Sequence, residues 1–456
     1  MDKKQRNKIL TVLFIGVLMG ALDIAIVGPA LPAIQKQFNV DERAVSWIFG
    51  IYVLFNLIGT PLMAKLSDVV SRRRIYILDI SLFALGSLIV ALSPNFTLLL
   101  IGRAVQGFGA GGIFPVASAV IGDTFPEENR GSALGLIGAV FGIAFILGPA
   151  IAGVLLLFSW HWLFIVNIPI AVVVIYLSLS RIPDISGVIK SKFDWRGMSL
   201  LIIILSSLAY GLNRINSAKL IESISSPTVF PFFIVSIVLL PFFIINENKA
   251  GSPVVRTKLL NPLQVKLTTI LAMGAGLSEA VVIFIPPLLV SAFGLTASKA
   301  SFMLIPVVIA MAIGSPTAGR MLDKFGSKVV LITGTTLLTA GMFGLTLNAM
   351  SIVTFYINAS FIGLGMGFLV GAPLRYIMLR EAKKTERGSA QGLLTIFTGM
   401  GQLFGGVFVG ALASSQGGGV TGLRSAYFWV GIIMIVLIFV SFGLKSHHRE
   451  LQTTAD

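Results

Sequence analysis

The sequence predicts an all-α integral membrane protein of fourteen transmembrane helices, arranged as two six-helix bundles plus two inserted central helices. Three observations support this fold class: an apolar composition, fourteen apolar stretches of membrane-spanning length, and a repeat that relates the two halves of the chain. Of the 456 residues, 55% are hydrophobic and only 12% are charged, whereas soluble domains average about 25% charged residues. The bilayer must therefore be the solvent for most of the chain.

The apolar stretches follow one another along the whole chain. Read with a window of about 19 residues, they begin near Ile9, Val45, Ile75, Phe96, Ala133, Trp162, Met198, Val229, Leu267, Phe302, Val329, Ile352, Leu393 and Ala426. A helix needs about 20 apolar residues to cross the bilayer, so these stretches leave no polar segment long enough for a soluble domain. The first stretch contains Asp23 and lacks a small-residue cleavage site, and we expect it to be retained as a helix.

The basic residues predict the orientation, because Lys and Arg in short loops resist translocation. With the N-terminus in the cytoplasm, the inner segments carry 27 of the 34 bases. We therefore expect a multi-pass protein of the cell membrane with both termini cytoplasmic. The net charge of +15 then reflects attraction to the anionic inner leaflet, and its spread along the chain argues against nucleic acid as a partner. The absence of cysteine excludes thiolate chemistry.

An internal repeat relates the two halves. Residues 130–136, RGSALGL, recur as RGSAQGL at an offset of 257, and residues 107–111, GFGAG, recur as GLGMG at an offset of 256. Asp68 recurs as Asp323. The repeat predicts six-helix bundles at 1–183 and 251–456, with two inserted helices and their linkers at 184–250. Internal duplication is typical of secondary transporters, whose substrate site lies between the repeats near the middle of the bilayer.

Two short loops carry an Asp followed by several bases. They read AKLSDVVSRRR at 64–74 and GRMLDKFGSK at 319–328. An Asp and an Arg at a helix end can pair with each other or with a neighbouring helix, and so hold one conformation until a gate moves. Asp123 is the predicted partner of Arg72; alternatively, the bases only enforce topology. The candidate gating residues are Asp68, Arg72, Arg73, Asp123, Asp323, Lys324 and Lys328.

The stretch that begins near Phe96 contains a charge, Arg103. An arginine at the centre of a membrane helix costs about 2.5 to 3.5 kcal/mol on insertion scales, so it should face a partner or a water-filled cavity. A static ion pair and a place in a proton path both satisfy this requirement.

The following stretch carries small residues and a proline at Gly135, Gly148, Pro149 and Gly153. Small residues allow two helices to approach closely, and proline bends a helix, which suits a segment between two moving bundles. General close packing is the alternative, because glycine is common in membrane helices.

Together these motifs resemble those of the major facilitator superfamily, in particular its fourteen-helix branch of drug:proton antiporters, over nearly the whole chain. The two loops are similar to the signature G-x-L-a-D-r-x-G-r-k, although Ala64 and Ser71 replace its glycines in the first loop. Residues 99–111 resemble the buried-arginine motif, and the Gly and Pro set resembles the antiporter motif. Residues 22–32, LDIAIVGPALP, resemble the first helix of the branch. The resemblance implies gating loops, a proton path at Arg103, and export.

Three charges are predicted to lie at one depth. Asp23 is about 21 Å and Glu279 about 18 Å from the cytoplasmic starts of their stretches, and Arg103 is about 20 Å from the inside. Asp79, about 6 Å in, is expected to be interfacial and structural. Burial favours the protonated form of a carboxyl group, and competition between a proton and a cation for one carboxylate couples their movements. Asp23, Arg103 and Glu279 are therefore the predicted proton-coupling and substrate residues; a hydrogen-bonded structural acid is the alternative for each carboxyl.

The expected function is a proton-coupled antiporter that exports amphipathic, cationic drugs by alternating access. Its expected partners are the small-molecule substrate, protons and the bilayer; we expect a monomer driven by the proton gradient, without cofactor or metal. Five aromatic residues that could line a cavity are Phe141, Phe145, Phe284, Tyr376 and Phe397. The alternatives are export of one compound, such as a tetracycline-like antibiotic, a lipid or a metabolite, and import by proton symport. An enzyme is disfavoured, because the sequence shows no nucleophile–base pair, metal cluster or nucleotide loop.

Overall fold

The computed structural model describes residues 3–184, 193–251, 253–347, 351–383 and 386–452, and within them the regular structure is helical. Thirteen helical segments are long and apolar enough to cross a membrane, and one of them, Ala297–Gly344, changes direction at Gly326. Gly326 has φ 79, a conformation that glycine adopts without a steric penalty. Divided at Gly326, the thirteen segments give fourteen spans in the described part of the chain, which confirms the predicted fold class.

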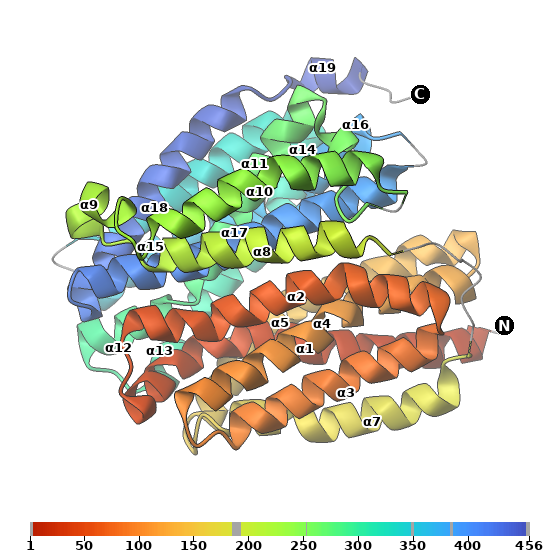
Figure 1. The fold of residues 1–456 in the computed structure, drawn as a ribbon, viewed down its shortest axis with the longest axis horizontal. Helices are drawn as coiled ribbons and strands as arrows, with labels where there is room; N and C mark the ends of the chain where they lie inside the picture. The colour runs from red at the N-terminus through yellow and green to blue at the C-terminus, as the bar shows by residue number, and fades with distance from the viewer. Residues whose placement is uncertain (1–2, 185–192, 252, 348–350, 384–385, 453–456) are drawn as a thin grey trace. The chain divides into compact units, whose positions relative to one another are not determined.

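Contacts divide the chain into two compact units. Unit 1 comprises residues 1–40, 47–195 and 296–302, and unit 2 comprises 41–46, 196–295 and 303–456. The helices of unit 1, drawn mainly in red to yellow in Figure 1, are α1 (Lys3–Phe38), α2 (Glu42–Val69), α3 (Arg72–Ala91), α4 (Phe96–Thr124), α5 (Glu127–Leu155), α6 (Trp162–Ile165), α7 (Asn167–Arg181) and α13 (Ala297–Phe302). The first residues of α2 group with unit 2.

Unit 2 contains the remaining helices, drawn in yellow-green to blue in Figure 1. They are α8 (Trp195–Asn213), η1 (Ser217–Lys219), α9 (Leu220–Ile224), α10 (Phe230–Lys249), η2 (Thr257–Leu260), α11 (Leu263–Val282), α12 (Ile285–Phe293), α14 (Ile305–Gly344), α15 (Ile352–Leu369), α16 (Ala372–Glu381), α17 (Arg387–Ser415), α18 (Gly419–Phe442) and α19 (His447–Gln452).

The two predicted inserted helices are α8 and α10, and both group with unit 2. They contact each other through Ser236, whose hydroxyl donates to the carbonyl oxygen of Ile204 at 3.2 Å. Part of the predicted linker, 185–192, lies outside the described residues. The three-part division at 183 and 250 stays a prediction.

Glycine at the helix crossings brings the site-bearing helices together. In unit 1, a side chain at Gly107 of α4 would meet the backbone of Tyr52 in α2, and one at Gly109 would meet the backbone of Asp79 in α3. In unit 2, Gly276 of α11 lies against the backbone of Thr398 in α17. Lipid supplies no hydrophobic force between helices, so van der Waals packing holds them together. Small residues strengthen this packing because they allow the helix backbones to approach closely. Polar side chains on α4 and α11 are therefore held against their neighbours.

Asp79, predicted to be interfacial and structural, is fully buried between helices, with an exposed fraction of 0%. Its carboxylate lies against Gly112 of α4, where the missing Cβ leaves room for it. Among the described residues neither carboxylate oxygen has a hydrogen-bond partner. The interfacial depth of Asp79 stays a prediction, since packing against Gly112 shows burial between helices and not depth in the bilayer.

Replacing Asp79 with Thr is expected to stabilise the protein. The residue 256 positions later is Thr335, which is buried and donates its hydroxyl to the carbonyl of Leu331 at 2.8 Å. A threonine at position 79 can make the same bond within its own helix, and an unsatisfied buried polar group costs about 1 to 3 kcal/mol. Thermal unfolding in detergent should show a higher midpoint for Asp79→Thr and a lower one for the reciprocal Thr335→Asp. An Asp79→Thr midpoint at or below that of the wild type would contradict this assignment.

Candidate functional site

A buried polar network in unit 1 joins helices α1, α3, α4 and α7. Its members are Asp23, Ser87, Arg103, Gln106 and Asn167, each with an exposed fraction of 2% or less. Gln106 Nε2 donates to Asp23 Oδ1 at 2.7 Å and to Ser87 Oγ at 2.8 Å. Asn167 Nδ2 lies 3.4 Å from the same Asp23 oxygen and 3.3 Å from Ser87 Oγ. Asp23 Oδ1 therefore accepts from two amides, while Asp23 Oδ2 pairs with the guanidinium of Arg103.

Arg103 is the centre of this network. Its Nη1 donates to Asp23 Oδ2 at 2.7 Å and to Gln106 Oε1 at 2.6 Å, and its Nε donates to the carbonyl of Ile48 at 3.1 Å. The guanidinium also lies over the rings of Tyr52 and Phe164, with centroids at 4.2 and 5.7 Å. Aromatic faces stabilise a desolvated cation. The ion pair and the rings together offset the cost of burying Arg103. Of the two expected surroundings, a partner or a water-filled cavity, the structure shows a partner, Asp23.

The second carboxyl group, Glu279, lies on α11 in unit 2 and is partly buried. Gln402 of α17 donates from Nε2 to Glu279 Oε2. Gly276, one turn earlier on α11, allows α17 to approach closely enough for this bond. No ion pair to Glu279 is found within the described part of the chain. Its direct hydrogen-bond partner is the neutral amide of Gln402, and the charge of Arg375 acts on it from a greater distance.

The repeat relates these two carboxyl groups. Glu279 follows Asp23 by 256 residues, and the residue that follows Arg103 by 256 is Ala359, which is buried in α15. Each half thus carries an acid at the same position, while only the first half carries the arginine. This offset is a sequence signal for Glu279 that depth alone does not provide.

The first Asp-and-base segment, residues 64–74, contains a compact ion-pair cluster. Arg72 pairs with Asp68 one turn earlier, and its Nε donates to Asp123 Oδ2 of α4 at 2.9 Å. The predicted contact between Arg72 and Asp123 is confirmed; its role in gating stays a prediction. In the second loop Asp323 is exposed and has no ion pair to another described residue, while Lys324 lies over the ring of Phe325 at 5.2 Å. Ion pairs therefore hold the first segment, whereas the second shows a contact between a base and an aromatic ring.

In each unit a serine within the Asp-and-base segment, Ser71 in 64–74 and Ser327 in 319–328, binds a carboxylate that is distant in the sequence. Ser71 donates to Asp184, which follows α7 and also pairs with Arg73 at 2.9 Å. Ser327, next to Lys328, donates both its hydroxyl and its backbone N–H to Glu450 of α19, the latter at 3.1 Å. Sequence reasoning missed both carboxylates, because they are more than 100 residues from the loops and belong to no motif.

The Asp184 contact is expected to make stability depend on pH. The hydroxyl of Ser71, followed by the charges of Arg73 and Arg74, lowers the pKa of Asp184 despite partial desolvation. A lowered pKa in the folded state stabilises above the unfolded value, which is about 3.9, and that contribution is lost as the pH falls through the folded value. The midpoint of thermal unfolding should therefore be lower in Asp184→Asn than in the wild type at pH 7. The difference should shrink toward pH 3; a constant difference would contradict the assignment.

The small residues of α5 have different surroundings within unit 1. Gly148 lies against Ala25 of α1, and Gly153 against the ring of Phe302 in α13. Ser301 Oγ donates to the carbonyl of Pro149 at 2.7 Å, and Ser298 Oγ donates to that of Gly153 at 2.6 Å. Gly135 is exposed and has open space around it. Close packing therefore accounts for Gly148 and Gly153 and gives no reason for Gly135.

Comparisons with known proteins agree with this architecture. The sequence profile described as Major Facilitator Superfamily matches residues 13–247 and 268–455. The chain belongs to the major facilitator superfamily. It is 35% identical over 406 residues to the uncharacterized MFS-type transporter YfiU of Bacillus subtilis, covering 88% of this chain and 78% of that protein. It is 28% identical over 451 residues to the multidrug efflux pump SdrM of Staphylococcus aureus, covering 95% and 96%.

A solved structure of a superfamily member has the same fold. The D-xylose–proton symporter aligns with a TM-score of 0.69 over 97% of this chain and 98% of its own, at 15% sequence identity. This likeness shows the fold alone. The superfamily consists of transporters, and the protein is accordingly a multi-pass membrane transporter.

The aromatic residues predicted as candidates for a cavity divide into packed and partly exposed ones. Phe284 is buried, and Tyr376 packs against the buried cluster of Ala318, Leu322, Val330 and Phe368. Phe141 forms an edge-to-face contact with Phe114 at 5.6 Å. Phe145 and Phe397 are partly exposed. Tyr376 also lies beneath the guanidinium of Arg380, at 5.2 Å from the ring centroid. The rings beside the buried charge of Arg103 are Tyr52 and Phe164, which sequence reasoning missed because nothing in their local sequence marks them.

Proposed function

We propose that this superfamily member is a proton-coupled antiporter that exports amphipathic, cationic drugs by alternating access. It would act in the cell membrane as a monomer with both termini cytoplasmic, driven by the proton gradient without a cofactor. Several relatives are named as multidrug proteins, among them SdrM and the multidrug transporter protein MdtP of Bacillus subtilis. Their similarity supports drugs as the substrate class.

The observation that carries this proposal is the different partner of each carboxyl group. Asp23 is held by Arg103, with 2.7 Å between Oδ2 and Nη1, at zero exposure. Glu279 is held by the neutral amide of Gln402. A carboxylate beside a fixed cation has its charge compensated, whereas one beside an amide can take up either a proton or a substrate cation. Glu279 is therefore the proposed exchange site, and the network of Asp23 and Arg103 is the proposed second element of the proton path.

The direction of transport rests on α5. The motif at Gly148, Pro149 and Gly153 resembles that of antiporters, and its two buried glycines lie in close helix contacts. Such contacts suit a helix that must slide or bend as the protein alternates between states.

Transport by purified protein in liposomes tests the proposal. An interior more acidic than the bath should drive accumulation of ethidium, and a protonophore that abolishes the gradient should abolish accumulation. Liposomes without protein are the control. Uptake that persists without the pH gradient would contradict proton coupling. Failure to accumulate ethidium and a panel of small lipophilic cations would contradict the broad substrate class and favour one dedicated compound.

A further inference from the structure

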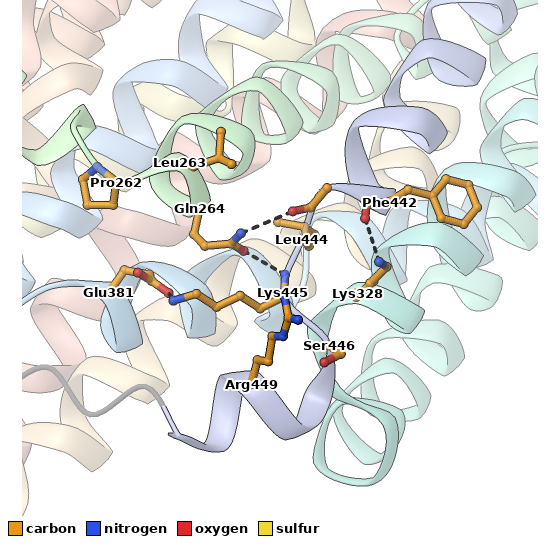
Figure 2. A pocket seen from close by; sticks show the side chains of 11 residues that line it. Pro262, Leu263, Gln264, Lys328, Glu381, Phe442, Leu444, Lys445, Ser446 and Arg449 are labelled. Atoms are coloured by element: carbon orange, nitrogen blue, oxygen red, sulfur yellow. Dashed lines mark hydrogen bonds and ion pairs between the residues drawn. The ribbon is translucent and has the colours of Figure 1, made fainter.

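A cavity of about 740 Å³ opens in unit 2 where α11 begins and α18 ends. It lies outside the carboxyl sites and receives side chains from five segments (Figure 2). Its lining includes Leu263 and Gln264 at the start of α11, Lys328 of α14 and Glu381 of α16. The end of α18 and the segment after it contribute residues 442–446, and α19 contributes Arg449. The transport proposal gives this cavity no role.

The charge of this pocket is positive. Three bases, Lys328, Lys445 and Arg449, line it with one acid, Glu381, to which Lys445 Nζ is bonded. Lys328 Nζ donates to the carbonyl of Phe442 at 2.6 Å, as Figure 2 shows. An ammonium group carries three N–H donors, so this single bond leaves Lys328 with donors for an anion. Lysine and arginine together are the side chains that bind phosphate oxygens most strongly.

The rim of the pocket is apolar. Leu263 is 64% and Phe442 is 53% exposed, and these residues mark the ends of two membrane-length helices, α11 and α18. In a membrane protein such helix ends lie near the lipid headgroups. A ligand that fits both features has a phosphate for the bases and hydrocarbon for the exposed apolar side chains. Basic pockets between membrane helices bind anionic headgroups in this way.

Contacts within the protein hold α19 beside the pocket when no ligand is bound. Glu450 is bound by Ser327, and Arg380 Nη1 donates to the backbone carbonyl of Glu450 at 3.4 Å. Gly326, at positive φ, leaves space for His447 and Glu450. These contacts are made by residues that do not line the cavity, and they hold α19 against α14 and α16.

We propose that this pocket binds the phosphate headgroup of an anionic phospholipid, with Lys328, Lys445 and Arg449 around the phosphate and the acyl chains along Leu263 and Phe442. The proposal requires that the protein spans a membrane and is independent of what it transports.

Thermal unfolding of the purified protein in neutral detergent micelles tests this site. Added phosphatidylglycerol should raise the midpoint of the wild type more than added phosphatidylcholine does, and the double variant Lys328→Gln/Arg449→Gln should lose this difference. Its apparent affinity for phosphatidylglycerol should fall by about tenfold or more, since two charge-assisted contacts are removed. Lys249→Gln is the matched control, because Lys249 is an exposed base at the end of α10 that does not line the pocket.

Four outcomes would overturn the proposal. They are an equal shift from both lipids, an unchanged affinity in the double variant, an equal loss in Lys249→Gln, and a shift from inorganic phosphate alone as large as that from phosphatidylglycerol. The last would assign the pocket to a free anion. If the double variant does not fold, Arg449→Gln alone decides, because it changes only α19 and leaves the membrane-length helices intact; it should still reduce the affinity for phosphatidylglycerol.

Discussion

Glu279→Gln is expected to abolish accumulation of a lipophilic cation against its gradient while leaving the fold intact. Glutamine has nearly the same shape and resembles the protonated acid, so α11 can keep its close contact with α17 through Gly276. The variant loses the competition between a proton and a substrate cation for binding to the carboxylate. Coupling free energies of this kind typically correspond to about 5- to 150-fold changes in affinity, and active uptake into liposomes should fall by at least the lower figure.

The pH dependence of cation binding provides a second measurement of the same prediction. In the wild type, acid pH should weaken cation binding, because protonation removes the charge of Glu279; in Glu279→Gln, binding should be weak at every pH. Glu222→Gln is the control, since Glu222 is an exposed acid paired with Lys219 in α9 and η1. A Glu279→Gln protein that still accumulates ethidium at the wild-type rate would move the exchange site elsewhere.

The sequence predicts most of this fold because the bilayer imposes strong constraints. Fourteen apolar stretches, read by length and hydropathy, correspond to the fourteen spans once α14 is divided at Gly326. Helix ends were less predictable. The first helix begins at Lys3 rather than near Ile9, and α5 begins at Glu127 rather than near Ala133, since polar residues extend a helix beyond the apolar stretch that predicts it.

The charged residues of the candidate site were predictable, because a charge in an apolar helix must be buried with a partner. The neutral residues that contact those charges were not predictable. Arg103 in an apolar helix demands an acid, and Asp23 at the same depth supplies it. Ser87, Asn167 and Tyr52 are residues that occur in many positions of a membrane helix, and only tertiary packing brings them into the network of Asp23, Gln106 and Arg103. Gln106 lies within residues 99–111, which resemble the buried-arginine motif, and its spacing of three residues from Arg103 places both on one helix face.

Asp23→Asn is expected to destabilise the protein strongly, because it leaves Arg103 buried without its counter-ion. Breaking a buried pair by removing one partner costs about 3 to 5 kcal/mol, of which much is the uncompensated charge. Arg103→Gln should cost less, since a carboxyl group left alone can become neutral by taking up a proton. The double variant Asp23→Asn/Arg103→Gln should be more stable than the sum of the single variants predicts. Unfolding in detergent by a denaturant, analysed as a double-mutant cycle, measures this interaction.

The same double variant decides between the two roles that an arginine at this depth can have. A static ion pair serves only the fold, so its joint replacement by amides, which can still hydrogen-bond to Gln106 and Asn167, would restore both stability and transport. A pair that takes part in the proton path cannot be replaced by groups that do not ionise. We therefore expect stability to recover and proton-driven uptake to remain lost. Recovery of wild-type uptake in the double variant would assign Asp23 and Arg103 to the scaffold and leave Glu279 as the single exchange site, because it alone of the three would still titrate.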